Sequence, residues 1–235
     1  MDHRGTPARR IPPRFSAVLL DWRGTLVVTP TFSLMVRMTL TQLGRDASAD
    51  AVEAVLARLR GADRRQVDSP DVDTDPAVHR RAHAAWFADA GLDDELADTL
   101  YEVADRDELN PFAEDVGETL EALHGAGVRI GVLSDIHFDL RPAFRRHATA
   151  DGRMWADLIG VWALSCETGL VKPDPAAFAA ALDQFGVPAD DVLMVGDRGP
   201  WDGGAAAVGI TTLLLPPLRA TGHRRLRAVL DLVLP

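Results

Sequence analysis

The stretch Asp21-Trp22-Arg23-Gly24-Thr25 follows directly on the apolar run from Phe15 to Leu20, and this junction decides the fold. An apolar run that stops at a carboxylate predicts a buried strand, and the Gly-Thr pair behind it predicts a turn. In a parallel α/β sheet, ligands bind at the carboxyl ends of the strands. The junction therefore predicts that Asp21 lies at a ligand-binding edge, although an isolated Asp at a strand end is also a common turn residue.

Three later segments strengthen this interpretation. They are Val128–Leu133 with Ser134 and Asp135 behind it, the stretch 169–175 around Lys172, and Val192–Val195 with Gly196, Asp197 and, further on, Asp202. Together with the first stretch they resemble, in this order, the four motifs of the haloacid dehalogenase (HAD) superfamily: a nucleophile Asp loop, a Ser or Thr, a Lys and an acidic Gly-Asp pair. The resemblance covers residues 15 to about 216, and its motif lysine is the only lysine of the chain.

Short apolar segments alternate with helical patterns over most of the chain. Strands that are apolar on both faces and alternate with helices are typical of a parallel sheet covered on both sides. The predicted strands are Ala17–Leu20, Val128–Leu133, Leu158–Val161, Val192–Val195 and Thr211–Leu215. The predicted helices between and after them are Val116–His124, Phe138–Arg146, Pro175–Phe185, Trp201–Val208 and Gly222–Leu232. We therefore expect an α/β fold with a Rossmann-like parallel sheet.

A long segment after the first motif has no strand pattern. Helical periodicity recurs there in Thr31–Leu43, Ala49–Leu59, Pro76–Ala90 and Glu95–Arg106. An α-helical insert at this place resembles the cap domain of many superfamily members. We expect a core of residues 15–27 and 111–235, a helical cap of residues 28–110, and a flexible arm of residues 1–14. The turn-rich segment 66–76 holds four aspartates but lacks the Gly and Glu of an EF-hand, so it is interpreted as a solvated linker.

Composition limits the classes of partner and compartment. The chain has 235 residues, 47% of them hydrophobic, and a net charge of −10. This acidity argues against nucleic acid or an anionic membrane as partner. No stretch reaches the ~18 apolar residues of a membrane span, and the N-terminus is not of signal-peptide type. The single cysteine, Cys166, excludes an internal disulfide, fits a cytoplasmic protein and is interpreted as inert core. The oligomeric state is open.

The resemblance implies phosphoryl transfer. Asp21 would be the nucleophile that forms an aspartyl-phosphate, and Lys172 would supply positive charge to it. Mg²⁺ would be held by Asp21, the backbone carbonyl of Arg23 and Asp197, with Asp202 beside it. The remaining candidates would contact the substrate, the hydroxyls by binding phosphate oxygens and the indole by stacking, although for the indole packing at the cap hinge is favoured. They are Thr25, Ser134, Asp135 and Trp22.

The first motif departs from the phosphatase pattern at Arg23. Most superfamily phosphatases carry a second Asp there, which protonates the leaving oxygen. A guanidinium has a pKa above ~12 and cannot act as an acid near pH 7. General acid catalysis contributes roughly a hundred- to ten-thousand-fold. We therefore expect alkyl phosphate monoesters to be slow substrates, and substrates whose leaving group departs as a stable anion to be better.

Several functions compete. A dehalogenase has no need of a metal-binding Asp197, and a phosphonoacetaldehyde hydrolase needs a lysine in its cap, which this chain lacks. Two alternatives stay open: a metal-dependent phosphatase for a small phosphorylated metabolite, and a catalytically weakened binding or regulatory protein. His79 and His83 share one helical face and are interpreted as exposed helix residues rather than as part of the active site.

Overall fold

The computed structural model describes residues 11–104, 106 and 109–235. Its centre is one parallel sheet with the strand order β3-β2-β1-β4-β5. The strands are β1 (Ala17–Leu20), β2 (Arg129–Ser134), β3 (Ile159–Leu164), β4 (Val192–Gly196) and β5 (Thr211–Leu214). All strand pairs are parallel, so the predicted Rossmann-like α/β fold is confirmed.

The register of the central strands aligns the candidate site. Leu20 at the end of β1 lies opposite Val132 of β2 and Val195 of β4. All four residues of β1 are buried because helices cover both faces of the sheet. The residues that follow these strands therefore emerge at the same edge, and Asp21 and Asp197 are among them.

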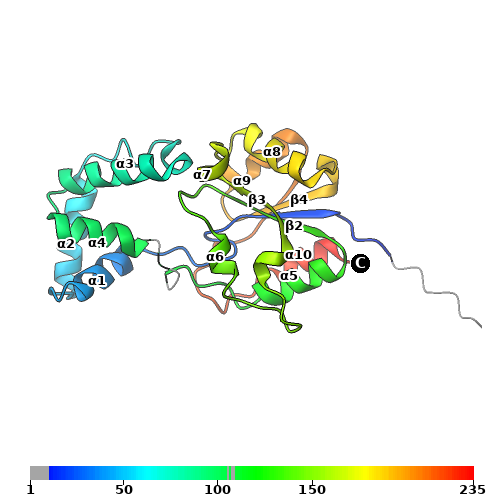
Figure 1. The fold of residues 1–235 in the computed structure, drawn as a ribbon, viewed down its shortest axis with the longest axis horizontal. Coiled ribbons are helices and arrows are strands. Elements are labelled where there is room, and N and C mark those ends of the chain that lie inside the picture. The colour runs from blue at the N-terminus through cyan, green and yellow to red at the C-terminus, as the bar shows by residue number, and fades with distance from the viewer. Residues whose placement is uncertain (1–10, 105, 107–108) are drawn as a thin grey trace, which may run out of the picture.

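Helices pack on both faces (Figure 1). On one face lie α5 (Val116–Gly125), α6 (Arg141–Phe144) and α10 (Arg227–Val233), whose apolar side chains join one core cluster. On the other lie α8 (Pro175–Phe185) and the 3₁₀ helix η5 (Gly203–Val208), with a second core cluster. Two short helices lie at the carboxyl ends of the strands: α7 (Ser165–Thr168) follows β3, and α9 (Gly199–Asp202) follows β4.

Two predicted helices are shorter than expected. The segment Phe138–Arg146 is α-helical only over α6, because the carboxylate of Asp139 accepts a hydrogen bond from the Arg141 amide and starts the helix there. The last helix begins at Arg227 rather than Gly222. The buried carboxylate of Asp115 accepts a hydrogen bond from the amide of Leu226, just before that start.

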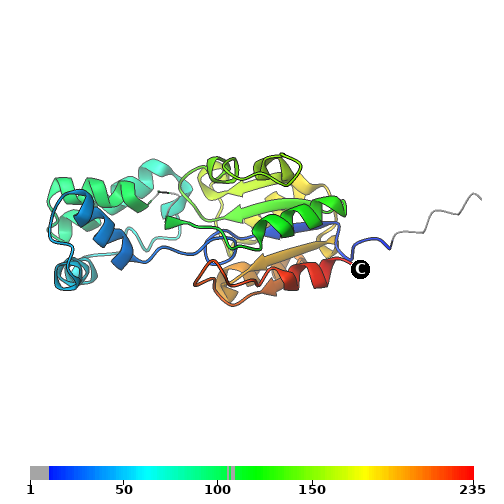
Figure 2. The same cartoon turned by 90° about the horizontal axis from the view of Figure 1, so that it is seen from below.

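Residues 32–104 form a helical insert with its own apolar core. Its helices are α1 (Phe32–Gln42), α2 (Ala49–Gly61), α3 (Pro76–Asp89) and α4 (Asp94–Ala104). Side chains of Thr31, Ser48 and Asp75 cap the first three. The insert lies beyond the end of the sheet at which β1 ends, on the side away from the C-terminus (Figures 1 and 2). None of the described helices is long and apolar enough to cross a membrane.

The aspartate-rich segment before α3 is only partly a solvated linker. It contains the 3₁₀ helix η1 (Val72–Thr74), which packs against α7 of the core. The Ser165 hydroxyl donates a hydrogen bond of 2.8 Å to the backbone carbonyl of Asp73. Asp68, Asp71 and Asp75 are exposed, as expected, but the side chain of Asp73 is only 30% exposed. For Asp73 the linker interpretation is wrong, because the turn docks on the core.

Candidate active site

A buried carboxylate and a buried lysine meet at the carboxyl end of β1. Lys172 Nζ lies 2.5 Å from Asp21 Oδ1, and the Thr25 hydroxyl donates a hydrogen bond of 2.9 Å to Asp21 Oδ2. Burial raises the pKa of Asp21, although Lys172 opposes this shift. Burial alone would lower the pKa of Lys172, but the carboxylates of Asp21, Asp202 and Asp135 together raise it. At neutral pH the lysine is therefore a fixed cation beside the candidate nucleophile.

Asp202 orients this pair. Its Oδ1 accepts a hydrogen bond of 2.7 Å from Lys172 Nζ, and its Oδ2 accepts hydrogen bonds from the amides of Asp197 and Arg198. Gly196 makes room for the carboxylate, since a Cβ there would lie 2.2 Å from Asp202 Oδ2. Both oxygens are thus engaged by protein groups, which suits a positioning role next to a metal ion.

Asp197 carries an oxygen that lacks a protein partner. Its Oδ1 is buried and accepts no hydrogen bond from any described residue. Burial, and after it the charges of Asp21 and Asp202, raise the pKa of Asp197 to about 6. One carboxylate oxygen from each of Asp21, Asp197 and Asp202 lies within 4.8 Å of the others. Three neighbouring carboxylates, of which Asp197 has a buried oxygen without a partner, fit a hard divalent cation such as Mg²⁺.

The loop after β1 comes unusually close to this cluster. Gly24 has φ +85, and a Cβ on it would lie 2.4 Å from Asp197 Oδ2. Only glycine combines this left-handed backbone with such a close approach. The Gly of the first motif is therefore explained by the distance between the two loops.

Two further predicted site residues, Ser134 and Asp135, lie on the wall of one cavity. Ser134 lies with Asp21, Lys172 and Asp197 on the wall of a cavity of about 330 Å³. Asp135 lies on the same wall, and its Oδ1 accepts a hydrogen bond of 2.9 Å from the Lys172 amide. Burial raises the pKa of Asp135. This carboxylate fixes the lysine loop.

Trp22 points away from the cavity. Its ring is 1% exposed and packs edge-on against Phe112 at 5.2 Å and tilted against Phe144 at 5.4 Å between centroids. The structure thus gives Trp22 a packing role, and stacking on a substrate ring is not supported. Cys166 is also partly buried against the core, and burial raises the pKa of its thiol.

Arg23 joins the site to the end of the helical insert. Its Nε donates a hydrogen bond of 2.8 Å to Asn110 Oδ1, and its Nη2 donates to the carbonyl of Ala104 at 3.3 Å. Its guanidinium also lies 5.9 Å from the Phe138 ring centroid. Arg23 lines the cavity over Asp21, so a positively charged residue lies on the wall of that cavity.

A second cavity, of about 290 Å³, lies between the insert and the core. It shares Arg23, Thr29, Asp73 and Asp135 with the cavity over Asp21. Its other walls are mostly aromatic and aliphatic, with histidines at one side. The wall includes Phe32, Met35, Trp86, Phe87, Leu100, His79, His83 and His137.

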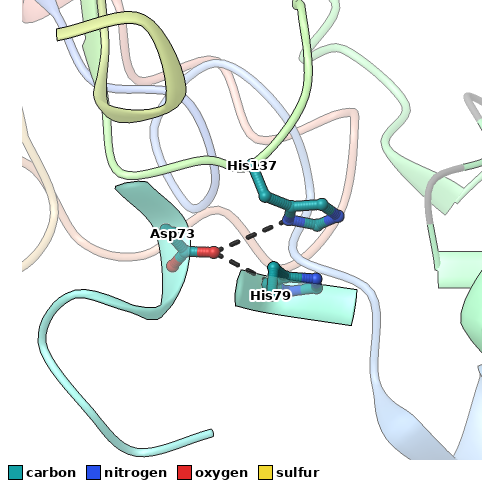
Figure 3. A group of neighbouring side chains, drawn as sticks. All are labelled: Asp73, His79 and His137. Atoms are coloured by element: carbon teal, nitrogen blue, oxygen red, sulfur yellow. Dashed lines mark ion pairs between the residues drawn. The ribbon is translucent and has the colours of Figure 1, made fainter. Parts of the chain in front are cut away.

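The histidine side of this cavity was missed from the sequence. His79 of α3 and His137 of the loop after β2 are buried and both face Asp73 (Figure 3). The interpretation of His79 as an exposed residue is wrong, whereas His83 is half-buried and stacks on it at 4.0 Å. Burial, with His137 and His83 beside it, lowers the pKa of His79 to about 3. One sequence feature could have indicated these histidines: His137 lies only three residues after the predicted site residue Ser134.

The parallel sheet and the buried carboxylate–lysine pair at its edge define an α/β protein with a candidate nucleophilic site. The chain belongs to the haloacid dehalogenase-like hydrolases, whose family model matches residues 15–209. The phosphoglycolate phosphatase of Pseudomonas savastanoi pv. phaseolicola is 30% identical over 206 residues, which cover 84% of this chain and 68% of that protein.

Solved structures show the same fold. A 2-haloacid dehalogenase from Pseudomonas syringae pv. tomato is 25% identical with a TM-score of 0.58, over 85% of this chain and 86% of that one. A HAD phosphatase from Thermococcus onnurineus is 22% identical with a TM-score of 0.55, over 89% and 90%. The protein is thus a HAD-like hydrolase with phosphatases and dehalogenases among its relatives.

Proposed function

We propose that this hydrolase is a metal-dependent phosphatase that acts through an aspartyl-phosphate on Asp21. The observation that carries the proposal is the buried Asp197 oxygen without a partner, close to Asp21 and Asp202. A dehalogenase reaction has no use for such an oxygen, whereas a phosphate dianion approaching a carboxylate requires a cation between them. The phosphatase relatives support a small phosphorylated substrate.

Each residue of the site has its own role in this mechanism. Asp21, Asp197 and the backbone carbonyl of Arg23 would hold Mg²⁺, which when bound neutralises charge on the transferring phosphoryl group. Asp21 attacks phosphorus through a carboxylate oxygen, and the bond from phosphorus to the leaving oxygen breaks. Lys172 keeps its proton and stabilises the charge on both partners. Water then attacks the aspartyl-phosphate and releases inorganic phosphate and the free carboxylate.

Phosphate oxygens have donors of their own. The Ser134 hydroxyl lines the cavity over Asp21, and backbone N–H groups of the turn 22–25 can add to it. The Thr25 hydroxyl donates to Asp21 in the absence of ligand, so it holds the nucleophile's orientation and turns to phosphate only as the nucleophile is consumed. The hydrogen bond fixes one carboxylate oxygen and leaves the other next to Lys172.

Arg23 restricts the leaving group. A fixed cation pairs with a leaving group that departs as a stable anion, but it gives no proton to an alkoxide. Acyl phosphates and phosphoanhydrides are therefore the substrate classes that fit. The helical insert would act as the cap over this reaction, with Arg23 touching its last helix at Ala104.

The test is a screen for phosphate release from acetyl phosphate, pyrophosphate and sugar phosphates, with and without Mg²⁺. The proposal expects release that needs Mg²⁺, is strongest with acetyl phosphate and is lost in Asp21→Asn. Binding of phosphorylated compounds without any release would instead favour the binding-protein alternative. Chloride release from 2-chloropropionate without Mg²⁺ would favour a dehalogenase.

A further inference from the structure

Three side chains meet where the helical insert touches the core, outside the carboxylate cluster around Asp21. Asp73 lies in η1 and His79 in α3, both in the insert, while His137 follows β2 of the core (Figure 3). Both histidines are buried. One ligand atom from each of the three lies within 4.8 Å of the other two. The proposed phosphatase mechanism uses none of them.

His79 Nε2 and His137 Nδ1 both lie close to the same carboxylate oxygen of Asp73. His79 Nε2 lies 3.7 Å and His137 Nδ1 lies 3.6 Å from Asp73 Oδ1. These distances exceed those of ordinary hydrogen bonds. Two ligands bound about 2.1 Å from one ion at a tetrahedral angle are about 3.4 Å apart. The two distances to Asp73 are therefore close to those between ligands of one ion.

One of the two tautomers of His79 suits a metal ligand. Its Nδ1 lies 2.9 Å from the Tyr101 hydroxyl. When Nδ1 carries the proton and donates it to Tyr101, the lone pair of Nε2 faces the Asp73 carboxylate, and the two repel each other unless a cation lies between them. A metal-bound histidine commonly donates its other ring N–H to an oxygen, as here, and this contact fixes its tautomer.

The backbone around Asp73 is also held in place. The Ser165 hydroxyl donates to the Asp73 carbonyl at 2.8 Å and accepts a hydrogen bond from the Ile136 amide at 2.8 Å. One core serine therefore holds both the Asp73 turn and the loop that carries His137. The two imidazole rings lie face to face, with 3.3 Å between their centroids and an interplanar angle of 8°. Binding of one ion by both rings requires each ring to turn about its Cβ–Cγ bond.

We propose that Asp73, His79 and His137 bind a first-row transition-metal ion such as Zn²⁺, which links the helical insert to the core. Two imidazoles and one carboxylate favour Zn²⁺, Co²⁺ or Fe²⁺ over Mg²⁺, which prefers oxygen ligands. Three protein ligands leave a coordination position open, as catalytic zinc sites do. Asp73 lines both the cavity over Asp21 and the aromatic cavity, so this position faces the space a substrate would occupy.

The site is distinct from the Mg²⁺ site and does not rest on the phosphatase proposal. The experiment titrates the full chain, freed of any affinity tag, with Co²⁺ in excess Mg²⁺ and records visible absorption. One Co²⁺ per chain with a d–d band of four- or five-coordinate cobalt is expected. Wild-type protein without such a band would overturn the proposal, whatever the variants do.

Variants identify the ligands. His137→Gln and Asp73→Asn are expected to weaken Co²⁺ binding by more than about tenfold. His83→Gln removes a neighbouring imidazole outside the group, Cys166→Ser removes the only thiol, and Asp197→Asn removes the Mg²⁺ site; all three should bind Co²⁺ like the wild type. Circular dichroism checks that each variant is folded. Equal binding by His137→Gln and the wild type, or equal loss in His83→Gln, would contradict the assignment.

Discussion

At the scale of single residues, the site depends on how charges are paired. Lys172 is shared between Asp21 and Asp202, while Asp197 keeps a buried oxygen without a protein partner. The unpaired oxygen is costly without a cation. Arg23, in the place of the usual acid, donates hydrogen bonds to the Asn110 side chain and to the Ala104 carbonyl. The first two predictions concern Arg23 and Asp197.

The first prediction is that Arg23 selects the leaving group. Arg23→Asp should raise the hydrolysis rate of a sugar phosphate by roughly a hundred-fold or more, since it restores an acid for the departing alkoxide. Acetyl phosphate hydrolysis should change far less. Arg23→Gln is the control, because it removes the charge without adding an acid, and it should not raise the sugar phosphate rate. Wild type inactive on both substrates, with Arg23→Asp active on both, would show that Arg23 disables the enzyme.

The second prediction concerns pH in the absence of metal. The pKa of Asp197 is raised by burial from 3.8 to about 6, so the folded state takes up a proton that the unfolded state has already lost. The stability contributed by the protonated form is complete below the ordinary pKa and is lost as pH rises through about 6. As pH rises from 3.8 to about 6, the unfolding free energy of the wild type should therefore decrease relative to that of Asp197→Asn.

Denaturant titrations over that pH range measure this difference. Adding Mg²⁺ should restore stability to the wild type above the raised pKa, and it should do little for Asp197→Asn. A difference that instead rises with pH would contradict the assigned environment of Asp197.

At the scale of elements, the strands and the loops that follow them carry the site. The sequence predicted the strands and the motif residues because their signals are local: a short apolar run, then a polar side chain. The group of Asp73, His79 and His137 was not predicted, because it joins three segments through tertiary contact. The helix predicted over Phe138–Arg146 was too long, since the Asp139 side chain sets its start.

The third prediction tests the loop after β1. Gly24→Ala should abolish Mg²⁺ binding and lower stability, because its Cβ would clash with the Asp197 carboxylate 2.4 Å away. Gly44→Ala is a matched control, since Gly44 also has a positive φ but open space around it. Each should lose about 1 kcal/mol from backbone strain. Calorimetry should find normal Mg²⁺ binding in Gly44→Ala alone; binding in both would mean that the loops are not in contact.

At the scale of the whole molecule, the α/β core and the helical insert meet next to the candidate active site. The core holds the carboxylates and Lys172, and the helical insert, which has its own apolar core, lies beyond one end of the sheet (Figure 2). The sequence indicated both bodies, since the alternation of strands and helices stops at the insert. How the insert rests on the core could not be predicted, because the contacts of Ser165 with Asp73 and of Arg23 with Ala104 leave no periodic signal.

The fourth prediction is that the insert moves as a cap. Structures with and without fluoroberyllate, which mimics the phosphate on Asp21, should differ in the angle between insert and core, since closure excludes water from the intermediate. The Asp21→Asn variant should show no such response. An identical angle in both wild-type structures would contradict gating by the insert.

The central claim, phosphoryl transfer through Asp21, is tested most directly by acid quench after mixing with ³²P-labelled acetyl phosphate and Mg²⁺. Labelled protein should appear before phosphate release reaches steady state, and peptide mapping should locate the label on Asp21. The label should be stable in acid, be released by hydroxylamine, and be missing in Asp21→Asn and in protein without Mg²⁺. Phosphate release by wild type without any label on Asp21, or an equal label in Asp21→Asn, would contradict the account.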